Sequence, residues 1–501
     1  MAIFQCALVA AAALLPHAPA RAATFWVATG GSDTAGDGSE ADPWATIEHA
    51  VETVPDGSEV VVEPGTYSGR IRLDRAFAAG VVVRSLEPYR ALLRHDSTVV
   101  TIYRGQGITL EGFDIAHSGP GAGGLVIQIQ DLIGSPGPSD GGVSRITLRD
   151  NVLHDSWNND VLKINNGAVD VVVEGNMFYN QSGSDEHIDI NSVRDVVVRD
   201  NVFFNDFEGS GRVNGNDTSS FVVIKDSNGD FDEFTGARDI TVERNVFLGW
   251  QGSTGSNFVL IGEDGNAFFE ADGVTVVNNL MLGQSPETMR AAFGVKGGRN
   301  VDFLHNTVVG DLPSLAFAFR LNVEGANPPN QGIALRANVW SDPTGTMDDF
   351  SDTPFGETSS FTLTRNAYWN GGVAIPQNTG GDLVNLDDDA EAIVADPRLP
   401  PQAGLVLPRR RPARGDFADG SATIREAFVR LVTLYGRPPP ESALAGAANP
   451  AHAPAVDILG RPRSPTAPWL GAVEADVIFA DGFETGDVAA WSASVNDAPV
   501  R

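Results

Sequence analysis

The chain has 501 residues, and its 65 acidic against 34 basic residues give a formal net charge of −31. A surface of this charge repels nucleic acid, and it repels any acidic polymer unless a bound cation or a local basic patch reverses the field. The only cysteine is Cys6, near the N-terminus, so the rest of the chain has neither a disulfide nor thiolate chemistry.

The first 22 residues have the features of an export signal. An apolar run from Cys6 to Leu15 is followed by Ala-Arg-Ala, the small-x-small pattern that signal peptidase cuts. We therefore expect residues 1–22 to be a signal peptide and the protein to be secreted, to the periplasm or the cell exterior. No later stretch approaches 18 consecutive apolar residues, so no membrane span is predicted.

A short helix is predicted near the start of the mature chain. Residues 42–54, DPWATIEHAVETV, place apolar residues at helical spacing after an Asp-Pro start. We expect this helix to close one end of the fold, within an N-terminal cap over residues 23–58. Residues 55–69, PDGSEVVVEPGTYSG, then begin the first strand-rich unit.

Seven later segments share one template, in which three or four strand-forming residues precede a variable pair, an Asn and apolar residues. They are ITLRDNVL (146–153), VVVEGNMF (171–178), VVVRDNVF (196–203), ITVERNVF (240–247), VTVVNNLM (274–281), VDFLHNTV (301–308) and IALRANVW (333–340). A second alternating strand, such as DVLKIN or EHIDIN, comes before most copies. Short strands repeated every 25 to 44 residues predict an all-β fold, a single right-handed parallel β-helix over residues 59–345.

The Asn of each template copy is predicted to be structural. The seven are Asn151, Asn176, Asn201, Asn245, Asn279, Asn306 and Asn338. Stacked coils would bring these amides about 4.8 Å apart, so that they bond to one another as a ladder at an internal turn.

The last third of the chain does not follow the template. From about Gly345 the sequence is irregular and Pro-rich, and we expect residues 346–475 to pack along the outside of the β-helix. Residues 476–501 contain IFADGFETGDVAAWS, a short tail motif typical of secreted bacterial proteins, to which we assign no chemistry.

Two neighbouring stretches, NDVLKIN (159–165) and SDEHIDIN (184–191), carry most of the candidate chemistry. Strand alternation directs Lys163 and Asp189 outward and their apolar neighbours inward. The nearby carboxylates are those of Asp160, Asp185, Glu186 and Asp189. Unpaired carboxylates this close repel one another, so the cluster favours a bound cation. The alternative is a set of cross-coil salt bridges on a solvated face.

The opening WVATGGSDTAGDGSEADPWATIEHAVETVPDGSEVVVEPGTYSG (26–69) resembles the N-terminal signature of secreted β-helix proteins that include the family 9 polysaccharide lyases, which are calcium-dependent pectate lyases. That family places one Asp on a coil, Asp-Asp-x-x-Asp on the next coil and a Lys base on the coil after. Asp160, then Asp185, Glu186 and Asp189, then Lys225 follow the same order. Glu186 stands where the family has Asp, and Lys225 lies in SFVVIKD instead of a Gly-rich strand.

The resemblance implies a calcium-assisted β-elimination on an acidic, uronate-containing polysaccharide. Calcium, held by Asp160, Asp185, Glu186 and Asp189, would stabilise the charge that develops when the C5 proton of the uronate is removed. The base would be Lys225, or its rival Lys163, with a pKa lowered by burial or by positive charge. Lys296, Arg320 and His187 are candidates for binding substrate, with His187 expected at the surface or lining the site without a catalytic role.

Two other functions fit the same pattern. A β-helix glycoside hydrolase could use an acid pair such as Asp160 and Asp189, although the sequence has neither Gly-His-Gly nor Arg-Ile-Lys. A non-catalytic adhesive protein would only hold a glycan. The acidic loop DSNGDFDEF (226–234) is either a calcium loop or solvated, and GNDTSS (215–220) and GSTGSN (252–257) are expected to wall the groove. We expect a monomer.

Overall fold

The structure is a computed structural model that describes most of the chain. The described residues are 23–132, 142–182, 185–213, 220–229, 235–251, 255–283, 289–310, 317–347 and 349–475. The predicted signal peptide (1–22) and tail motif (476–501) lie outside these residues, as do most of the two predicted wall loops and residues 230–234 of the acidic loop.

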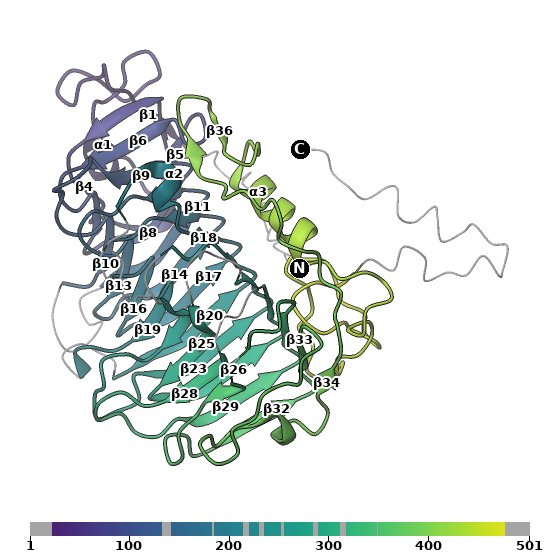
Figure 1. The fold of residues 1–501 in the computed structure, drawn as a ribbon. Helices are drawn as coiled ribbons and strands as arrows, with labels where there is room; N and C mark the ends of the chain where they lie inside the picture. Colours follow the sequence, from purple (N-terminus) through teal and green to yellow (C-terminus); the bar gives the residue numbers. More distant parts are fainter. Residues whose placement is uncertain are drawn as a thin grey trace, which may run out of the picture.

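Three long parallel sheets stack into a right-handed parallel β-helix, as the template predicted (Figure 1). Sheet I has twelve strands: β1 (Thr24–Val27), β2 (Glu59–Val62), β5 (Ala76–Ser85), β8 (Gln106–Glu111), β11 (Ser144–Arg149), β14 (Val169–Glu174), β17 (Arg194–Arg199), β20 (Ala237–Glu243), β23 (Ala271–Val277), β26 (Gly298–Leu304), β29 (Gln331–Arg336) and β32 (Phe361–Thr364).

Sheet II has ten strands: β4 (Ile71–Arg72), β7 (Val100–Ile102), β10 (Ile127–Gln130), β13 (Leu162–Asn165), β16 (Ile188–Asn191), β19 (Val222–Lys225), β22 (Gly255–Ile261), β25 (Met289–Lys296), β28 (Phe317–Asn322) and β31 (Ser351–Asp352). Sheet III has twelve: β3 (Gly65–Ser68), β6 (Ala91–His95), β9 (Asp114–His117), β12 (Val152–His154), β15 (Met177–Tyr179), β18 (Val202–Phe204), β21 (Val246–Phe247), β24 (Leu280–Leu282), β27 (Thr307–Val309), β30 (Val339–Asp342), β33 (Ala367–Asn370) and β34 (Ile393–Val394). Each coil passes from sheet I through sheet III to sheet II.

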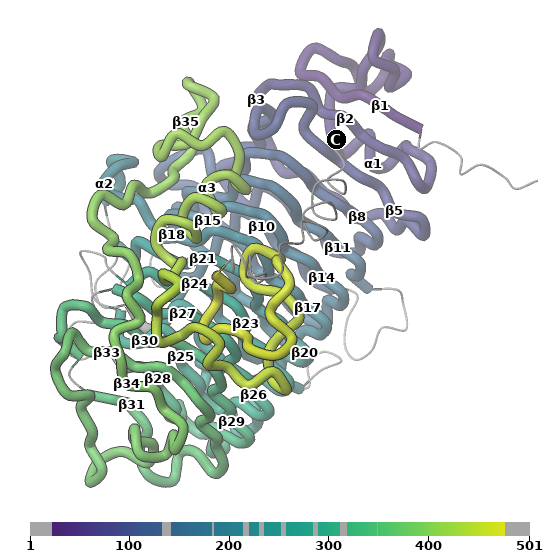
Figure 2. The backbone as a smooth tube through the Cα atoms, turned by 90° about the vertical axis from the view of Figure 1, so that its right-hand side faces the viewer, coloured from purple at the N-terminus to yellow at the C-terminus, as the bar shows by residue number. Residues whose placement is uncertain are grey.

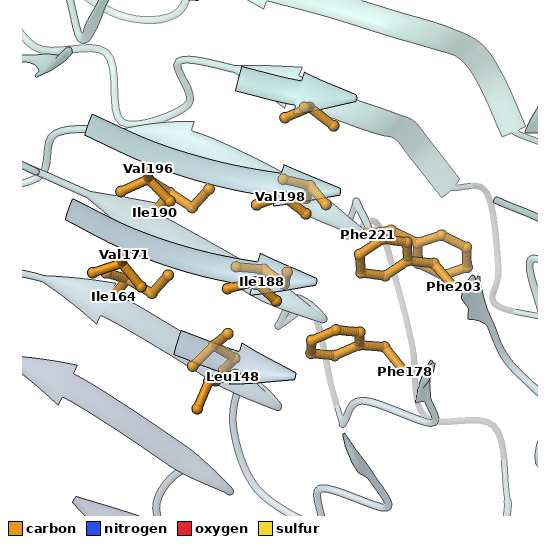
Figure 3. Packing of buried hydrophobic residues seen from close by; sticks show 14 of the residues in the cluster. Leu148, Ile164, Val171, Phe178, Ile188, Ile190, Val196, Val198, Phe203 and Phe221 are labelled. Carbon is orange, nitrogen blue, oxygen red and sulfur yellow. The ribbon is translucent and has the colours of Figure 1, made fainter. Parts of the chain in front are cut away.

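The core is a column of apolar side chains that repeat in register from coil to coil. On sheet I, Val171 lies beside Val196 of the next coil, and on sheet II, Ile164 lies beside Ile190. These residues are fully buried and point to the interior, where Phe178 and Phe203 stack at 4.9 Å between ring centroids (Figure 3). Alternation thus explains which side chains fill the core.

The predicted asparagine ladder is present. The Oδ1 atom of Asn245 accepts hydrogen bonds from the backbone N–H and the Nδ2 of Asn201, one coil earlier, both at 3.0 Å. Its Nδ2 donates to the carbonyl of Val198 at 2.9 Å. The ladder continues beyond the predicted seven to Asn366, whose amide donates to the carboxylate of Asp389 at 2.8 Å.

A left-handed residue precedes most of the ladder asparagines, at the turn from sheet I to sheet III. Asp150 has φ of 53° and Asp200 of 59°, and even Ala337 and Arg365 adopt this conformation, at 56° and 53°. A single residue with positive φ gives the sharp bend that this turn requires. The two residues before each Asn therefore vary in type, while their number stays at two.

The N-terminal end carries the predicted helix. It is α1 (Ile47–Thr53), and its N-cap is Thr46, whose side chain accepts from the backbone N–H of His49 at 3.2 Å. Its buried face, Ile47, Ala50 and Val51, joins the main core.

The stacking continues past residue 345, where the sequence had indicated an end. β32 and β33 belong to FTLTRNAYW (361–369), an eighth copy of the template that includes Asn366. Beyond it the chain returns along the outside of sheet III (Figure 2). Ile424 and Phe428 of α3 (Ile424–Leu431) pack in one cluster with the outer side chains of sheet III, among them Tyr179 and Phe204.

The remaining elements are short. They are α2 (Phe207–Ser210), the 3₁₀ helix η3 (Leu386–Asp388), the π-helical turn η4 (Val432–Gly436) and the antiparallel pair β35 (Arg410–Arg411) and β36 (Asp416–Phe417). Within the described ranges, every helix is too short or too polar to cross a bilayer.

Candidate functional site

Three successive strands of sheet II carry the charged side chains that the sequence singled out. Lys163 on β13 lies directly beside Asp189 on β16. Lys225 on β19 lies beside Asn191, one outward position further along the strand than Asp189. Because side chains alternate, Lys163, Asp189 and Lys225 all face the outside of the same sheet.

Two further carboxylates enter from the turns before these strands. The Oδ1 atom of Asp160 accepts a hydrogen bond from the backbone N–H of Glu186 at 2.9 Å. Side-chain oxygens of Asp160, Glu186 and Asp189 all lie within 4.8 Å of one another. We call these three residues the carboxylate triad, and they are only 1, 5 and 1 % exposed. The Oδ1 atom of Asp189 has no hydrogen-bond partner in the described part of the chain.

Burial and mutual repulsion act against full ionisation of the triad. Burial, and then the charge of Asp189, raise the pKa of Asp160 to about 7. Burial and the neighbouring Asp160 raise the pKa of Glu186 in the same direction. A buried group of like charges is stabilised by a proton or by a cation, so the triad favours binding one of the two.

Both candidate lysines contact the same carboxylate. The Nζ of Lys163 lies 2.5 Å from Oδ2 of Asp189 and 3.9 Å from Oδ2 of Asp160. The Nζ of Lys225 lies 3.9 Å from Oδ2 of Asp189. The side chain of Lys163 is 25 % exposed and that of Lys225 is 12 % exposed, so both ammonium groups lie between the triad and solvent.

The expectation that the base lysine has a lowered pKa is wrong for the protein without a bound cation. Burial acts to lower the pKa of each lysine, but nearby carboxylates outweigh it. Asp189 and Asp160 raise the pKa of Lys163, and Asp189 and Glu263 raise the pKa of Lys225. Both ammonium groups are therefore stabilised by the acids around them.

Two acidic residues that the sequence analysis did not single out also surround the ammonium group of Lys225. The Nζ of Lys225 lies 2.6 Å from Oε2 of Glu263 and 3.6 Å from Oδ1 of Asp264. The carboxylate of the fully buried Glu270 accepts from the backbone N–H groups of residues 263 to 266, at 2.7 to 3.2 Å, and so fixes their loop. The only sequence signal was an acidic pair directly after the strand FVLIG.

Asp185 does not join the triad. Among the described residues, the oxygen atoms close enough to share one metal ion belong to Asp160, Glu186 and Asp189. Burial raises the pKa of Asp185 to about 6, with Lys163 lowering it and Asp189 raising it, so this carboxyl lies near the site. Of the four predicted ligands, three therefore have oxygens close enough to share one ion, and Asp185 is their neighbour.

His187 does not lie where it was expected. It is fully buried, and its ring stacks on Phe221 with 4.3 Å between centroids, while its Nε2 contacts Oδ1 of Asn205 at 3.1 Å. Burial lowers the pKa of His187 to about 3. The residue sits in the turn before β16, where strand alternation does not apply, so it turns into the core and cannot bind a substrate from there.

Lys296 and Arg320 face outward, but on later coils. Lys296 pairs with Glu324 at 2.8 Å, and Arg320 pairs with Asp352 at 2.6 Å. Arg320 is four strands beyond Asp189 in sheet II, so the structure does not bring it to the triad. A role of either residue in substrate binding stays a prediction.

The described part of the acidic loop has a structural role. Both carboxylate oxygens of Asp226 accept backbone N–H groups: Oδ1 from Asn228 and Gly229, and Oδ2 from Gly236, at 2.6 to 2.9 Å. These contacts stabilise the local turn, and the prediction of a calcium site at 226–234 stays untested.

The triad fits a calcium ion chemically. Calcium binds six to eight oxygen ligands, mostly carboxylate, carbonyl and water oxygens. The triad offers only oxygens, from two successive coils, and the buried Oδ1 of Asp189 lacks a protein partner among the described residues. A divalent cation would remove the repulsion that raises the carboxyl pKa values.

Comparisons with known proteins concern the backbone. No protein-family model matches the chain, and no curated protein matches it. A GH136 lacto-N-biosidase from Eubacterium ramulus aligns with a TM-score of 0.49 and 11 % identity over 74 % of this chain and 67 % of that one. The pectate lyase Pel9A aligns with a TM-score of 0.47 and 12 % identity over 90 % of this chain and 96 % of that one. A rhamnogalacturonan lyase aligns with a TM-score of 0.45 and 15 % identity over 81 % of this chain and 98 % of that one.

Proposed function

We propose that the protein is a secreted polysaccharide lyase that cleaves a pectate-like, uronate-containing polymer by calcium-assisted β-elimination. The observation that carries the proposal is the contact of two lysine ammonium groups, from Lys163 and Lys225, with one carboxylate of a buried, oxygen-only triad. A base beside a cation site is the combination that removal of a proton next to a carboxylate requires.

The proposed reaction uses few protein groups. The base is the neutral form of a lysine, which the surrounding carboxylates disfavour unless a bound cation offsets their charge. Its Nζ takes the proton from C5 of the uronate, the electron pair forms the C4–C5 double bond, and the bond from C4 to the glycosidic oxygen breaks. The departing oxygen takes a proton from solvent. Asp160, Glu186 and Asp189 would hold calcium, with Asp185 beside them. When bound, calcium supplies positive charge to the uronate carboxylate as negative charge develops.

Lys225 is the proposed base, and Lys163 is its rival. Lys225 matches the family order, and Glu263 and Asp264 are placed to stabilise the ammonium that forms when it takes a proton. Lys163 makes the shorter contact with Asp189 and is the more exposed. Lys225→Ala and Lys163→Ala separate them, because loss of the base should reduce kcat about 10²- to 10⁴-fold, and Arg398→Ala, a surface change, is the control.

A substrate screen tests the proposal as a whole. Pectate, alginate and glycosaminoglycans are each incubated with the protein, with calcium or with a chelator, and the unsaturated product is followed by its ultraviolet absorbance. We expect product from at least one polymer and its loss on chelation. The lyase proposal fails if none of the three gives an unsaturated product in calcium.

A glycoside hydrolase is the second candidate, and one observation favours it. Side-chain oxygens of Asp160 and Glu186 lie within 4.8 Å of each other, and burial, with the charge of Asp189, raises the pKa of Asp160 to about 7. A carboxyl that keeps its proton at neutral pH is suited to act as a general acid. New reducing ends without ultraviolet absorbance, and no effect of chelation, would identify this activity.

Export and a monomeric state complete the proposal. The apolar run and the Ala-Arg-Ala site in residues 1–22 support secretion, and the strong negative charge supports a protein that stays apart from its own copies. Mass spectrometry of the protein from the culture medium would give the N-terminus, expected at Ala23, and size-exclusion chromatography with light scattering would give the mass.

A further inference from the structure

The outer face of sheet II differs on the two sides of the Lys163–Asp189 pair. Toward the C-terminus, the positions in line with Asp189 are Val223, Leu260 and Gly294, in strand order. Val223 and Leu260 are buried although they face outward, and Gly294 has no side chain to offer. Lys225 and its partners Glu263 and Asp264 are on this side but off this line, so the line itself presents no polar side chain for three coils.

Toward the N-terminus, the same line is polar and partly open. Gln128 lies directly beside Lys163, and Thr101 beside Gln128. The hydroxyl of Tyr103 donates to Oε1 of Gln128 at 2.8 Å, and Nε2 of Gln128 donates to Oε1 of Gln130 at 2.5 Å. Tyr103 and both glutamines are half-buried, so their polar ends are fixed but accessible.

Positive charge lies at the far end of this polar line. Arg72, on β4, is beside Thr101, and its exposed guanidinium contacts Glu48 at 3.3 Å. Burial raises the pKa of the Tyr103 phenol, and the charges of Arg70 and Arg72 act to lower it. Beyond them is a cavity of about 400 Å³ between α1 and residues 66–71, with Glu48 and Arg70 in its wall.

We propose that Arg72, Tyr103, Gln128 and Gln130, which we call the polar strip, form a glycan-binding surface that receives the uronate chain on the N-terminal side of the triad. The inference rests on the proposed function for the identity of the chain. Amide and phenol groups pair with sugar hydroxyls, and the planar guanidinium of Arg72 pairs with a uronate carboxylate. Coils repeat every 4.8 Å or so, a spacing comparable with one pyranose unit, so successive sugars would meet successive coils.

Binding of oligogalacturonates to the full-length protein tests the polar strip without turnover. Isothermal calorimetry in calcium, on the background of Lys225→Ala to prevent cleavage, compares trigalacturonate with hexagalacturonate. Gln128→Ala combined with Gln130→Ala should weaken hexamer binding about tenfold, as expected for one or two hydrogen bonds. Trimer binding, which spans fewer coils, should change less than twofold. Arg72→Ala should reduce affinity for hexagalacturonate but not for neutral xylohexaose.

The matched control is Gln331→Ala, an exposed glutamine on sheet I. Circular dichroism melting shows whether each variant is folded. Unchanged hexamer binding in a folded Gln128→Ala, Gln130→Ala variant would overturn the proposal, and so would failure of the unmodified strip to bind any uronate hexamer. If the strip variants weaken binding while the wild-type protein yields no unsaturated product, the polar strip stands and the lyase proposal fails.

Discussion

The asparagine ladder and the carboxylate triad are both clusters of buried polar side chains, and they are built in opposite ways. In the asparagine ladder, each amide of the inner coils uses its oxygen and its nitrogen, as Asn245 does with Asn201 and Val198. In the carboxylate triad, one oxygen of Asp189 has no partner among the described residues, and burial raises the pKa of Asp160 and Glu186.

The difference distinguishes a cluster that stabilises the fold from one that is suited to bind a ligand. A buried polar group that is fully paired stabilises a fold, whereas one left short of partners costs free energy and persists where it binds something. The ladder repeats over the eight successive coils from Asn151 to Asn366 and its amides are neutral, so it needs nothing from outside. The triad occurs on one pair of coils and becomes complete only with a proton or a cation. Substitutions in the two clusters should therefore change stability in opposite directions.

Asn245→Leu should cause the largest effect. It removes the acceptor for the backbone N–H and the amide of Asn201, and the donor to the carbonyl of Val198, all inside the core. Each unpaired buried group costs about 1–3 kcal/mol, so we expect the free energy of unfolding to fall by about 4 kcal/mol. Urea denaturation measures it, with Gln331→Leu as an exposed control. A loss below about 1 kcal/mol would show that the ladder is not a main source of stability.

His187→Phe tests a buried polar group that is half satisfied. Burial lowers the pKa of His187 to about 3, below its usual value near 6.5, so the unfolded chain binds the extra proton between these values. Stability contributed by the neutral ring is therefore lost as pH falls below 6.5. Phe keeps the stacking on Phe221 but does not titrate. The free energy of unfolding of the variant, relative to that of wild type, should therefore be roughly 2 kcal/mol higher at pH 5 than at pH 8.

The measurement is the difference in unfolding free energy between the two proteins at pH 5 and at pH 8. The value at pH 8 includes the lost contact with Asn205 but no protonation, and it serves as the internal reference. Equal differences at both pH values would mean that His187 is not held neutral in the core.

Glu186→Gln should stabilise the protein in the absence of calcium. Glu186 is buried beside Asp160, and among the described residues it forms no ion pair with a lysine, whereas Lys163 and Lys225 both contact Asp189. Replacing it with an uncharged amide relieves repulsion, and we expect a gain of about 1 kcal/mol. The same change should reduce the rise in Tm that calcium gives to the wild-type protein. A variant that is less stable in chelator, with its calcium response intact, would contradict a cation site at the triad.

Much of the fold could be predicted because it depends on local, periodic patterns. The strand period of two fixed which side of β13 and β16 holds Lys163 and Asp189. These two residues pair at a separation of 26 positions, one more than the spacing of 25 between the neighbouring template copies. The ladder followed from the position of Asn in each copy. An eighth copy, FTLTRNAYW, was missed because the neighbouring sequence is irregular.

The candidate site was harder to predict because its parts lie in turns. His187 points inward because strand alternation does not hold in the turn before β16, and its burial and its contacts with Phe221 and Asn205 show this only in the structure. Glu263 approaches Lys225 because Glu270 holds four backbone N–H groups of the loop, a contact that no local pattern encodes. The register of Lys225 likewise depended on the connection between β16 and β19, residues 192–221, whose length the repeat does not set.

Arg336→Gln should have the smallest effect, and it tests whether cross-coil ion pairs matter in themselves. Arg336 pairs with Asp302 at 2.7 Å on the outside of sheet I, and the two side chains are about a third or more open to solvent. Solvent-exposed pairs contribute little because water and salt screen them, so we expect a change within about 0.5 kcal/mol that disappears in high salt. Urea denaturation in low and high salt measures it. A loss above about 1 kcal/mol would mean that such pairs stabilise the coils, and the contact of Lys163 with Asp189 could then be read as one more structural pair and not as part of a site.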